Sequence, residues 1–111
     1  MSKRDSKLLL DDIRTAIGKI EQYILNLDKE GFLADDKTVD AVVRNLEIIG
    51  EAVRQMPEGY KQAHTQIAWG QIAGLRNRIV HDYFGLDLDL IWEIIKGDLP
   101  RLGHQLTDLN S

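Results

Sequence analysis

Apolar residues recur at intervals of three and four along almost the whole chain, a spacing that places them on one face of an α-helix. Residues 87–109 show the pattern most clearly, since they contain an almost strict alternation of three and four in Leu88, Ile91, Ile95, Leu99, Leu102, Leu106 and Leu109. No segment alternates polar and apolar residues for long enough to predict a β-strand. The pattern therefore predicts an all-α protein in which each helix buries one apolar stripe.

The same spacing predicts three further helices, over about residues 5–28, 36–55 (or 38–55) and 67–80, and a short helical turn at 58–63. We expect Gly31 to end the first region, Pro57 to stop the second and Pro100 to kink the last, where Asp98 would cap the restarted segment. Short loops between long amphipathic helices predict an antiparallel bundle of four to five helices.

Composition limits the class of protein further. A length of 111 residues fits one domain over 1–111, and the absence of cysteine excludes disulfides and thiolate metal sites. The three histidines have no metal-like spacing, so we expect no metal site and no cofactor. No apolar segment approaches the roughly 20 residues of a membrane span, which predicts a soluble, cytoplasmic protein with no membrane partner. The net charge of −4 argues against a protein that coats nucleic acid non-specifically.

One short segment concentrates side chains that do chemistry: residues 76–83, with the sequence RNRIVHDY. An arginine such as Arg76 binds a phosphate through two parallel hydrogen bonds, and a histidine such as His81 transfers protons near neutral pH. Together these two side chains can support phosphodiester cleavage without a metal. A structural interpretation also stays open, because cations near a helix C-terminus stabilise the helix dipole.

Spacing restricts how the segment is arranged. Residues five apart lie about 140° apart around an ideal helix, so Arg76 and His81 would point in different directions. Either the helix unwinds near His81, as Gly85 suggests, or two copies of the segment meet across a symmetric dimer. In both cases we expect the site at a helix end.

Over essentially its whole length the chain resembles the HEPN superfamily, in particular its HepT-like toxin branch, whose motif is Arg-x4-His-x-Tyr. The residues that carry the resemblance are Arg76, Asn77, His81 and Tyr83 in the motif, residues 44–52 (RNLEIIGEA), Trp69 and Gly74 before the motif, and Trp92 and residues 98–100 after it. The resemblance implies a HEPN-like homodimer that is a metal-independent endoribonuclease, with a composite active site where the two motifs face each other. It also implies a toxin of a toxin–antitoxin pair, silenced when an MntA-like nucleotidyltransferase antitoxin transfers AMP to Tyr83.

We assign roles to the motif on this basis. His81 would move protons and Arg76 would stabilise the phosphate charge, while Asn77 would orient His81 or bind phosphate. Arg78 either contacts the RNA substrate or forms a surface ion pair with Asp82.

Residues outside the motif leave alternatives open. Glu47 and Glu51 either form a solvated face with ion pairs along the helix, or one of them pairs with Arg76 or faces the cleft between the two motifs. Trp69 and Trp92 either stack on bases or, as we favour, pack in the core or an interface. Two other functions also remain: a non-catalytic HEPN helical partner that binds nucleotide or docks a nucleotidyltransferase, and a plain dimeric helix bundle.

Overall fold

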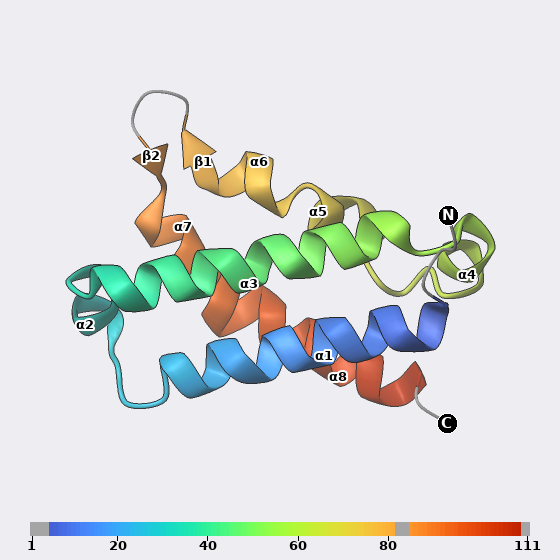
Figure 1. Cartoon of the computed structure of the whole chain (residues 1–111), viewed down its shortest axis with the longest axis horizontal. Coiled ribbons are helices and arrows are strands. Elements are labelled where there is room, and N and C mark those ends of the chain that lie inside the picture. The colour runs from blue at the N-terminus through green and yellow to red at the C-terminus, as the bar shows by residue number, and fades with distance from the viewer. Residues whose placement is uncertain (1–4, 82–84, 110–111) are drawn as a thin grey trace.

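The computed structural model describes residues 5–81 and 85–109, without the side chain of His81, and this part of the chain is mostly helical (Figure 1). This result confirms the all-α class. The elements are α1 (Ser6–Tyr23), α2 (Lys29–Leu33), α3 (Asp36–Gln55), α4 (Glu58–Ala63), α5 (Trp69–Ala73), α6 (Leu75–Ile79), β1 (Val80–His81), β2 (Gly85–Leu86), α7 (Leu88–Glu93), the π-helix η2 (Ile94–Asp98) and α8 (Leu99–Leu109).

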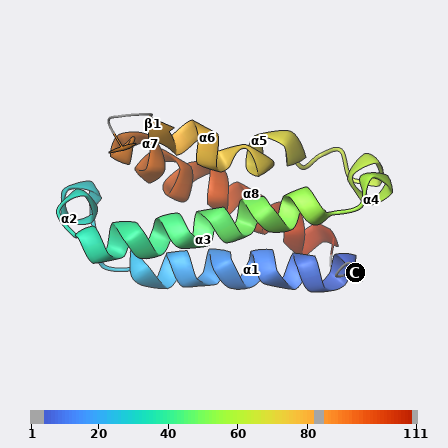
Figure 2. The same ribbon diagram turned by 45° about the horizontal axis from the view of Figure 1, so that its top comes forward.

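The two long helices α1 and α3 lie side by side and antiparallel, and they form the centre of the fold (Figures 1 and 2). The α5–α6 segment follows α3 on one side, while α8 packs against α1 and runs behind it in the view of Figure 1. Their apolar stripes meet in one core, in which Ile13, Ile49, Ile79 and Leu106 are fully buried. Among the helices that the structure describes, none combines the length and hydropathy needed to cross a bilayer.

Side chains at its ends fix the length of α3. The Asp35 carboxylate accepts hydrogen bonds from the backbone N–H and the hydroxyl of Thr38, at 3.2 and 2.8 Å, and so caps the first turn. The bonds from the Thr38 hydroxyl and N–H lower the pKa of Asp35 below its usual value. The helix ends at Gln55, just before Pro57, as predicted.

The first predicted helix is shorter than expected, and the prediction that Gly31 ends it is wrong. Helix α1 stops at Tyr23, and Gly31 lies inside the separate helix α2. The reason is a new helix start at Asp28, whose carboxylate accepts the N–H of Gly31 at 2.8 Å. A glycine in the first turn of a helix does not interrupt it, because an aspartate cap satisfies its N–H.

The third predicted helix is divided in two. Gly74 separates α5 from α6, and helical structure ends at Ile79 rather than Val80. Val80 is extended and begins an antiparallel pair of two-residue strands, in which Val80 pairs with Leu86 and His81 with Gly85. The sequence did not predict these strands, because two residues are too few to show alternation.

The last predicted helix contains a π-helical turn from Ile94 to Asp98, closed by a bond from the N–H of Leu99 to the carbonyl of Ile94. The departure from α-helix was expected at Pro100, whose ring nitrogen has no hydrogen to donate to Lys96, and it lies immediately before it. The chain enters α8 without leaving helical conformation, so no free helix end exists for Asp98 to cap. That part of the prediction is wrong.

Candidate active site

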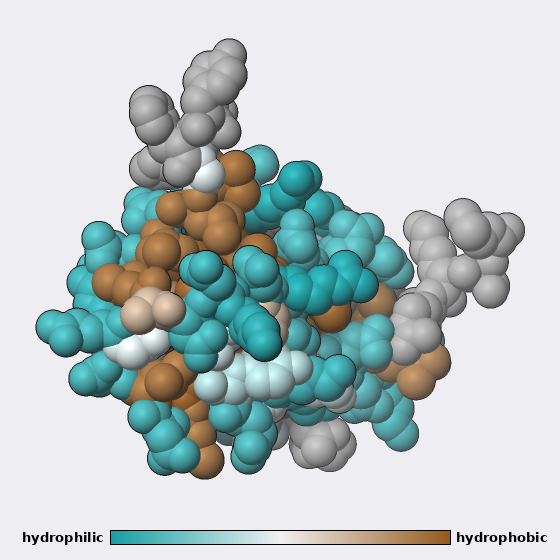
Figure 3. Space-filling model, turned by 60° about the vertical axis from the view of Figure 1, so that its left-hand side comes forward, coloured by the Kyte–Doolittle hydropathy of each residue, from teal (hydrophilic) through white to brown (hydrophobic). Residues whose placement is uncertain are grey.

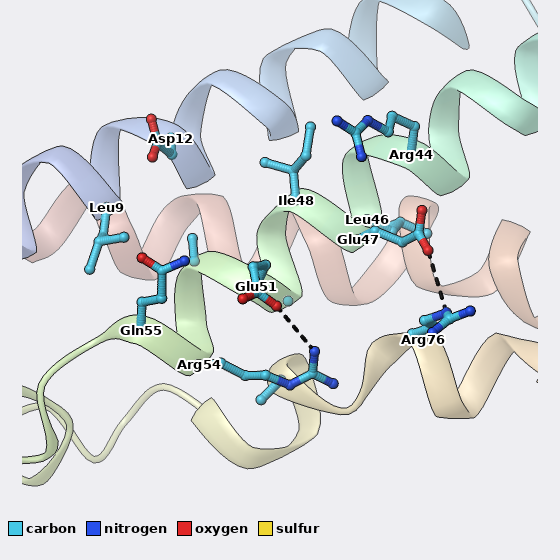
Figure 4. Close-up of a pocket in the computed structure, with 13 residues that line it drawn as sticks. Leu9, Asp12, Arg44, Leu46, Glu47, Ile48, Glu51, Arg54, Gln55 and Arg76 are labelled. Carbon is cyan, nitrogen blue, oxygen red and sulfur yellow. Dashed lines mark hydrogen bonds and ion pairs between the residues drawn. The ribbon is translucent and has the colours of Figure 1, made fainter. Parts of the chain in front are cut away.

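Arg76 projects from α6 toward α3, where its Nε lies 3.4 Å from Oε2 of Glu47 (Figure 4). The Arg76 side chain is 67% exposed and that of Glu47 is 39% exposed. One of the two interpretations of Glu47 is therefore confirmed: it pairs with the motif arginine. This contact runs through Nε, and the exposed guanidinium carries two further nitrogens that can donate to a phosphate.

Arg78 lies on the opposite side of α6. Its NH2 group is 3.6 Å from Oδ2 of Asp98, which belongs to η2. These two residues line a separate hollow of about 220 Å³ between α5–α6 and α8. The structure therefore gives Arg78 an ion-pair partner different from the predicted Asp82, which lies outside the described residues.

The chain reverses direction directly after α6. The carbonyl of Ile79 accepts the N–H of Asp87 at 2.8 Å, and Gly85 has a φ of +79°, a conformation that other residues rarely adopt. The predicted unwinding of the helix near His81 is thus confirmed. His81 has its backbone in β1, its side chain is not described, and Tyr83 lies outside the described residues.

A groove of about 440 Å³ runs over the exposed face of α3, between α1 and the α5–α6 segment (Figure 4). Its charged lining residues are Asp12, Arg44, Glu47, Glu51, Arg54 and Arg76. Four of them follow one another on α3 at spacings of three, four and three, which places them along one face. Arg54 pairs with Glu51 at 3.4 Å. Arg44 and Arg54 were not predicted as site residues, although their spacing from Glu47 and Glu51 places them on the same face of a helix.

Close packing fixes α5 against α3 beside this groove. A Cβ added at Gly50 would lie 3.3 Å from the carbonyl oxygen of Ile72, so only glycine fits there without a shift. Gly50 thus allows α3 and α5 to approach closely. Because α6 follows α5 after one residue, the same contact sets the position of Arg76.

The two tryptophans that were candidates for base stacking pack against other parts of the protein. Trp69 is buried and donates its indole N–H to the carbonyl of His64 at 3.0 Å. Trp92 packs against Phe32 with 5.4 Å between ring centroids. Packing was the favoured interpretation of both tryptophans.

Asn77 is exposed on α6. Within the described part of the chain, no three His, Asp or Glu side chains gather where they would hold a metal ion.

These features define a class: a small helical domain that presents an arginine at a helix end, directly before a turn that carries a histidine. Comparison with known proteins makes the class specific, because residues 13–109 match the model of the ribonuclease HepT-like family. The chain belongs to this family.

Similar proteins carry related names. The chain is 43% identical over 100 residues to "Probable ribonuclease HepT" of Thermococcus cleftensis, covering 90% of this chain and 91% of the relative. It is 37% identical over 106 residues to "Putative RNase MJ1380" of Methanocaldococcus jannaschii, covering 96% and 97%. It is also 35% identical to "Gamma-glutamylcyclotransferase and putative RNase MJ0434" of the same organism, covering 94% of this chain but 47% of that relative. No solved structure gives a significant match.

Proposed function

We propose that this protein is a metal-independent endoribonuclease in which Arg76 and His81 act on the scissile phosphate. The observation that carries the proposal is the placement of Arg76: an exposed guanidinium, paired with Glu47 and three residues before the end of α6, where the chain turns into the strand that contains His81. Membership of the ribonuclease HepT-like family gives the reaction class.

The proposed reaction is internal attack by the ribose 2′-hydroxyl on the adjacent phosphorus, with departure of the 5′-oxygen of the next nucleotide. The reaction requires removal of the 2′ proton, protonation of the leaving oxygen and stabilisation of the added negative charge on the phosphorane. His81 moves the protons and Arg76 binds the phosphate oxygens. Asn77, one position beyond Arg76, orients His81 or adds a phosphate contact.

We further propose that two copies of the chain form the active site, with one histidine acting as base and the other as acid. Apolar surface beside the hairpin supports this arrangement (Figure 3). Val80 is 38% exposed, and Leu86 and Leu88 line a hollow with Val39 of α3. A second copy that covers this surface would bring the two β1 strands, and therefore the two motifs, close together.

Regulation of the enzyme is the last part of the proposal. We propose that the enzyme is the toxin of a toxin–antitoxin pair, and that an MntA-like nucleotidyltransferase antitoxin silences it by transferring AMP to Tyr83. The modified tyrosine would place a bulky, negatively charged group two residues from His81. There it would occupy the proposed active site between the two copies and bind Arg76.

One experiment tests the enzyme and its regulation together. The chain is expressed alone and together with the nucleotidyltransferase, and both its intact mass and its cleavage of RNA in EDTA are measured. We expect cleavage by the chain alone, and loss of cleavage when the mass rises by AMP on Tyr83. His81→Ala is the inactive control and should keep the fold. Full activity of purified His81→Ala would reject the mechanism, and modification of a Tyr83→Phe chain would reject the assignment of the tyrosine.

A further inference from the structure

Among the other arginines that line the groove over α3, Arg54 resembles Arg76 in its surroundings. Arg54 has its NH1 3.4 Å from Oε2 of Glu51, and its side chain is 49% exposed. In each pair the arginine contacts a single carboxylate oxygen, so most of the guanidinium donors stay available. Figure 4 shows both arginines on the side of α3 that faces α5 and α6.

The two pairs lie along the groove rather than at one point. Arg54 follows Glu47, the partner of Arg76, by seven positions on α3, which is two helical turns and about 10 Å along the helix axis. A strand whose scissile phosphate binds Arg76 would therefore have to bring a different phosphate to Arg54. Both arginines line the same groove of about 440 Å³.

The carboxylates explain how an acidic protein keeps such a path free of non-specific binding. Glu47 and Glu51 balance the charge of the two arginines while the groove is empty. Ion pairs between exposed side chains contribute little to stability, so a phosphate with two oxygens aligned to a guanidinium can replace a carboxylate that makes one contact.

We propose that Arg54 binds a phosphate of single-stranded RNA next to the one that is cleaved, and that the α3 groove is the substrate track of the enzyme. The inference rests on the proposed ribonuclease function and adds a binding residue outside the Arg76–His81 motif. It assigns Glu51 to orient Arg54 and to compete with the phosphate.

The test uses fluorescence anisotropy with a labelled single-stranded RNA of mixed sequence and about twelve nucleotides, at several salt concentrations. All chains carry His81→Ala so that the RNA stays intact. We expect Arg54→Ala to weaken binding about three- to tenfold, and to lower the slope of log affinity against log salt by about one. Arg54→Lys should keep the slope because it keeps the charge. Glu51→Gln should tighten binding because it removes the competing carboxylate.

Arg101→Ala is the matched control, since Arg101 is exposed on α8, outside the groove, and the change removes the same charge. It should leave affinity and slope unchanged. Equal effects of Arg54→Ala and Arg101→Ala, in chains that unfold at the same temperature, would overturn the inference. If cleavage by the unaltered chain persists in that case, the ribonuclease proposal stands. If the unaltered chain does not cleave RNA and the His81→Ala chain does not bind it, both proposals fail.

Discussion

Arg76 and Arg78 are two positions apart in the sequence, and the structure gives them different surroundings. Arg76 faces α3 and the groove, whereas Arg78 pairs with Asp98 of η2. The sequence predicts that both are cationic and near a helix end. It does not predict which one faces the groove, because that depends on how α6 lies between α3 and η2.

Replacing each of these arginines by lysine should separate their roles. Arg76→Lys keeps the charge but loses the planar fork that aligns two phosphate oxygens, so we expect RNA cleavage to fall about a hundredfold. Arg78→Lys keeps an exposed ion pair, and we expect the rate of RNA cleavage to change by less than about threefold. Initial cleavage rates at saturating RNA measure both effects, with thermal unfolding as the check on folding. Similar losses in the two variants would contradict the assignment.

The side chains that contact the motif could be predicted only in part. The sequence identified Arg76 and His81 and left open whether Glu47 pairs with Arg76. It did not identify Arg54, whose position over the groove depends on the packing of α5 against α3. The roles of Arg76, Asn77, His81 and Tyr83 stay predictions.

At the scale of elements, helix α3 followed its sequence signals closely, because an aspartate cap and a proline fix its ends. Glycines were harder to interpret: Gly31 was expected to end a helix and lies inside one, whereas Gly74 separates two helices where none was expected to break. Glycine permits both outcomes, and the tertiary contacts decide between them. The contact of Gly50 with α5 is an example in which packing requires glycine.

A pair of glycine substitutions tests that contact. Gly50→Ala adds a methyl group that meets the Ile72 carbonyl at 3.3 Å, whereas a Cβ at Gly18 of α1 meets nothing within 4 Å. Alanine favours a helix by about 1 kcal/mol over glycine, so Gly18→Ala should stabilise the protein. Gly50→Ala should lose that gain and be less stable than Gly18→Ala by about 1–2 kcal/mol, since α5 must move. Urea unfolding monitored by circular dichroism measures the free energy of unfolding of both variants. Equal values would show that α5 can move away from α3 at little cost.

At the scale of the whole molecule, the packing of helices on one core follows from the apolar stripes, and the all-α class was predicted for that reason. The bundle of four to five helices stays a prediction. The homodimer stays a prediction that rests on family resemblance and on the apolar surface near Val80. The short hairpin that presents this surface was not predicted from the sequence, because its two-residue strands depend on where α6 ends.

Mixing active and inactive chains tests whether the active site needs two copies. Unaltered and His81→Ala chains are combined at fixed total concentration and left to exchange subunits. If each site needs a histidine from both copies, an equal mixture should show about a quarter of the activity, because only dimers of two unaltered chains cleave RNA. If each chain acts alone, about half should remain. Mixing with the active Arg101→Ala chain controls for exchange itself and should leave the activity unchanged.

The π-helical turn at Ile94–Asp98 has a consequence for which insertions and deletions this chain tolerates. A π-turn holds one residue more than an α-turn, and Gly97 in this turn is exposed. Deleting Gly97 would leave an ordinary α-turn, so Leu102 and Leu106 would keep their direction toward the core. A deletion inside α8 would instead rotate every residue that follows by about 100°. The chain thus tolerates the loss of one residue in this turn but not in the helix beyond it.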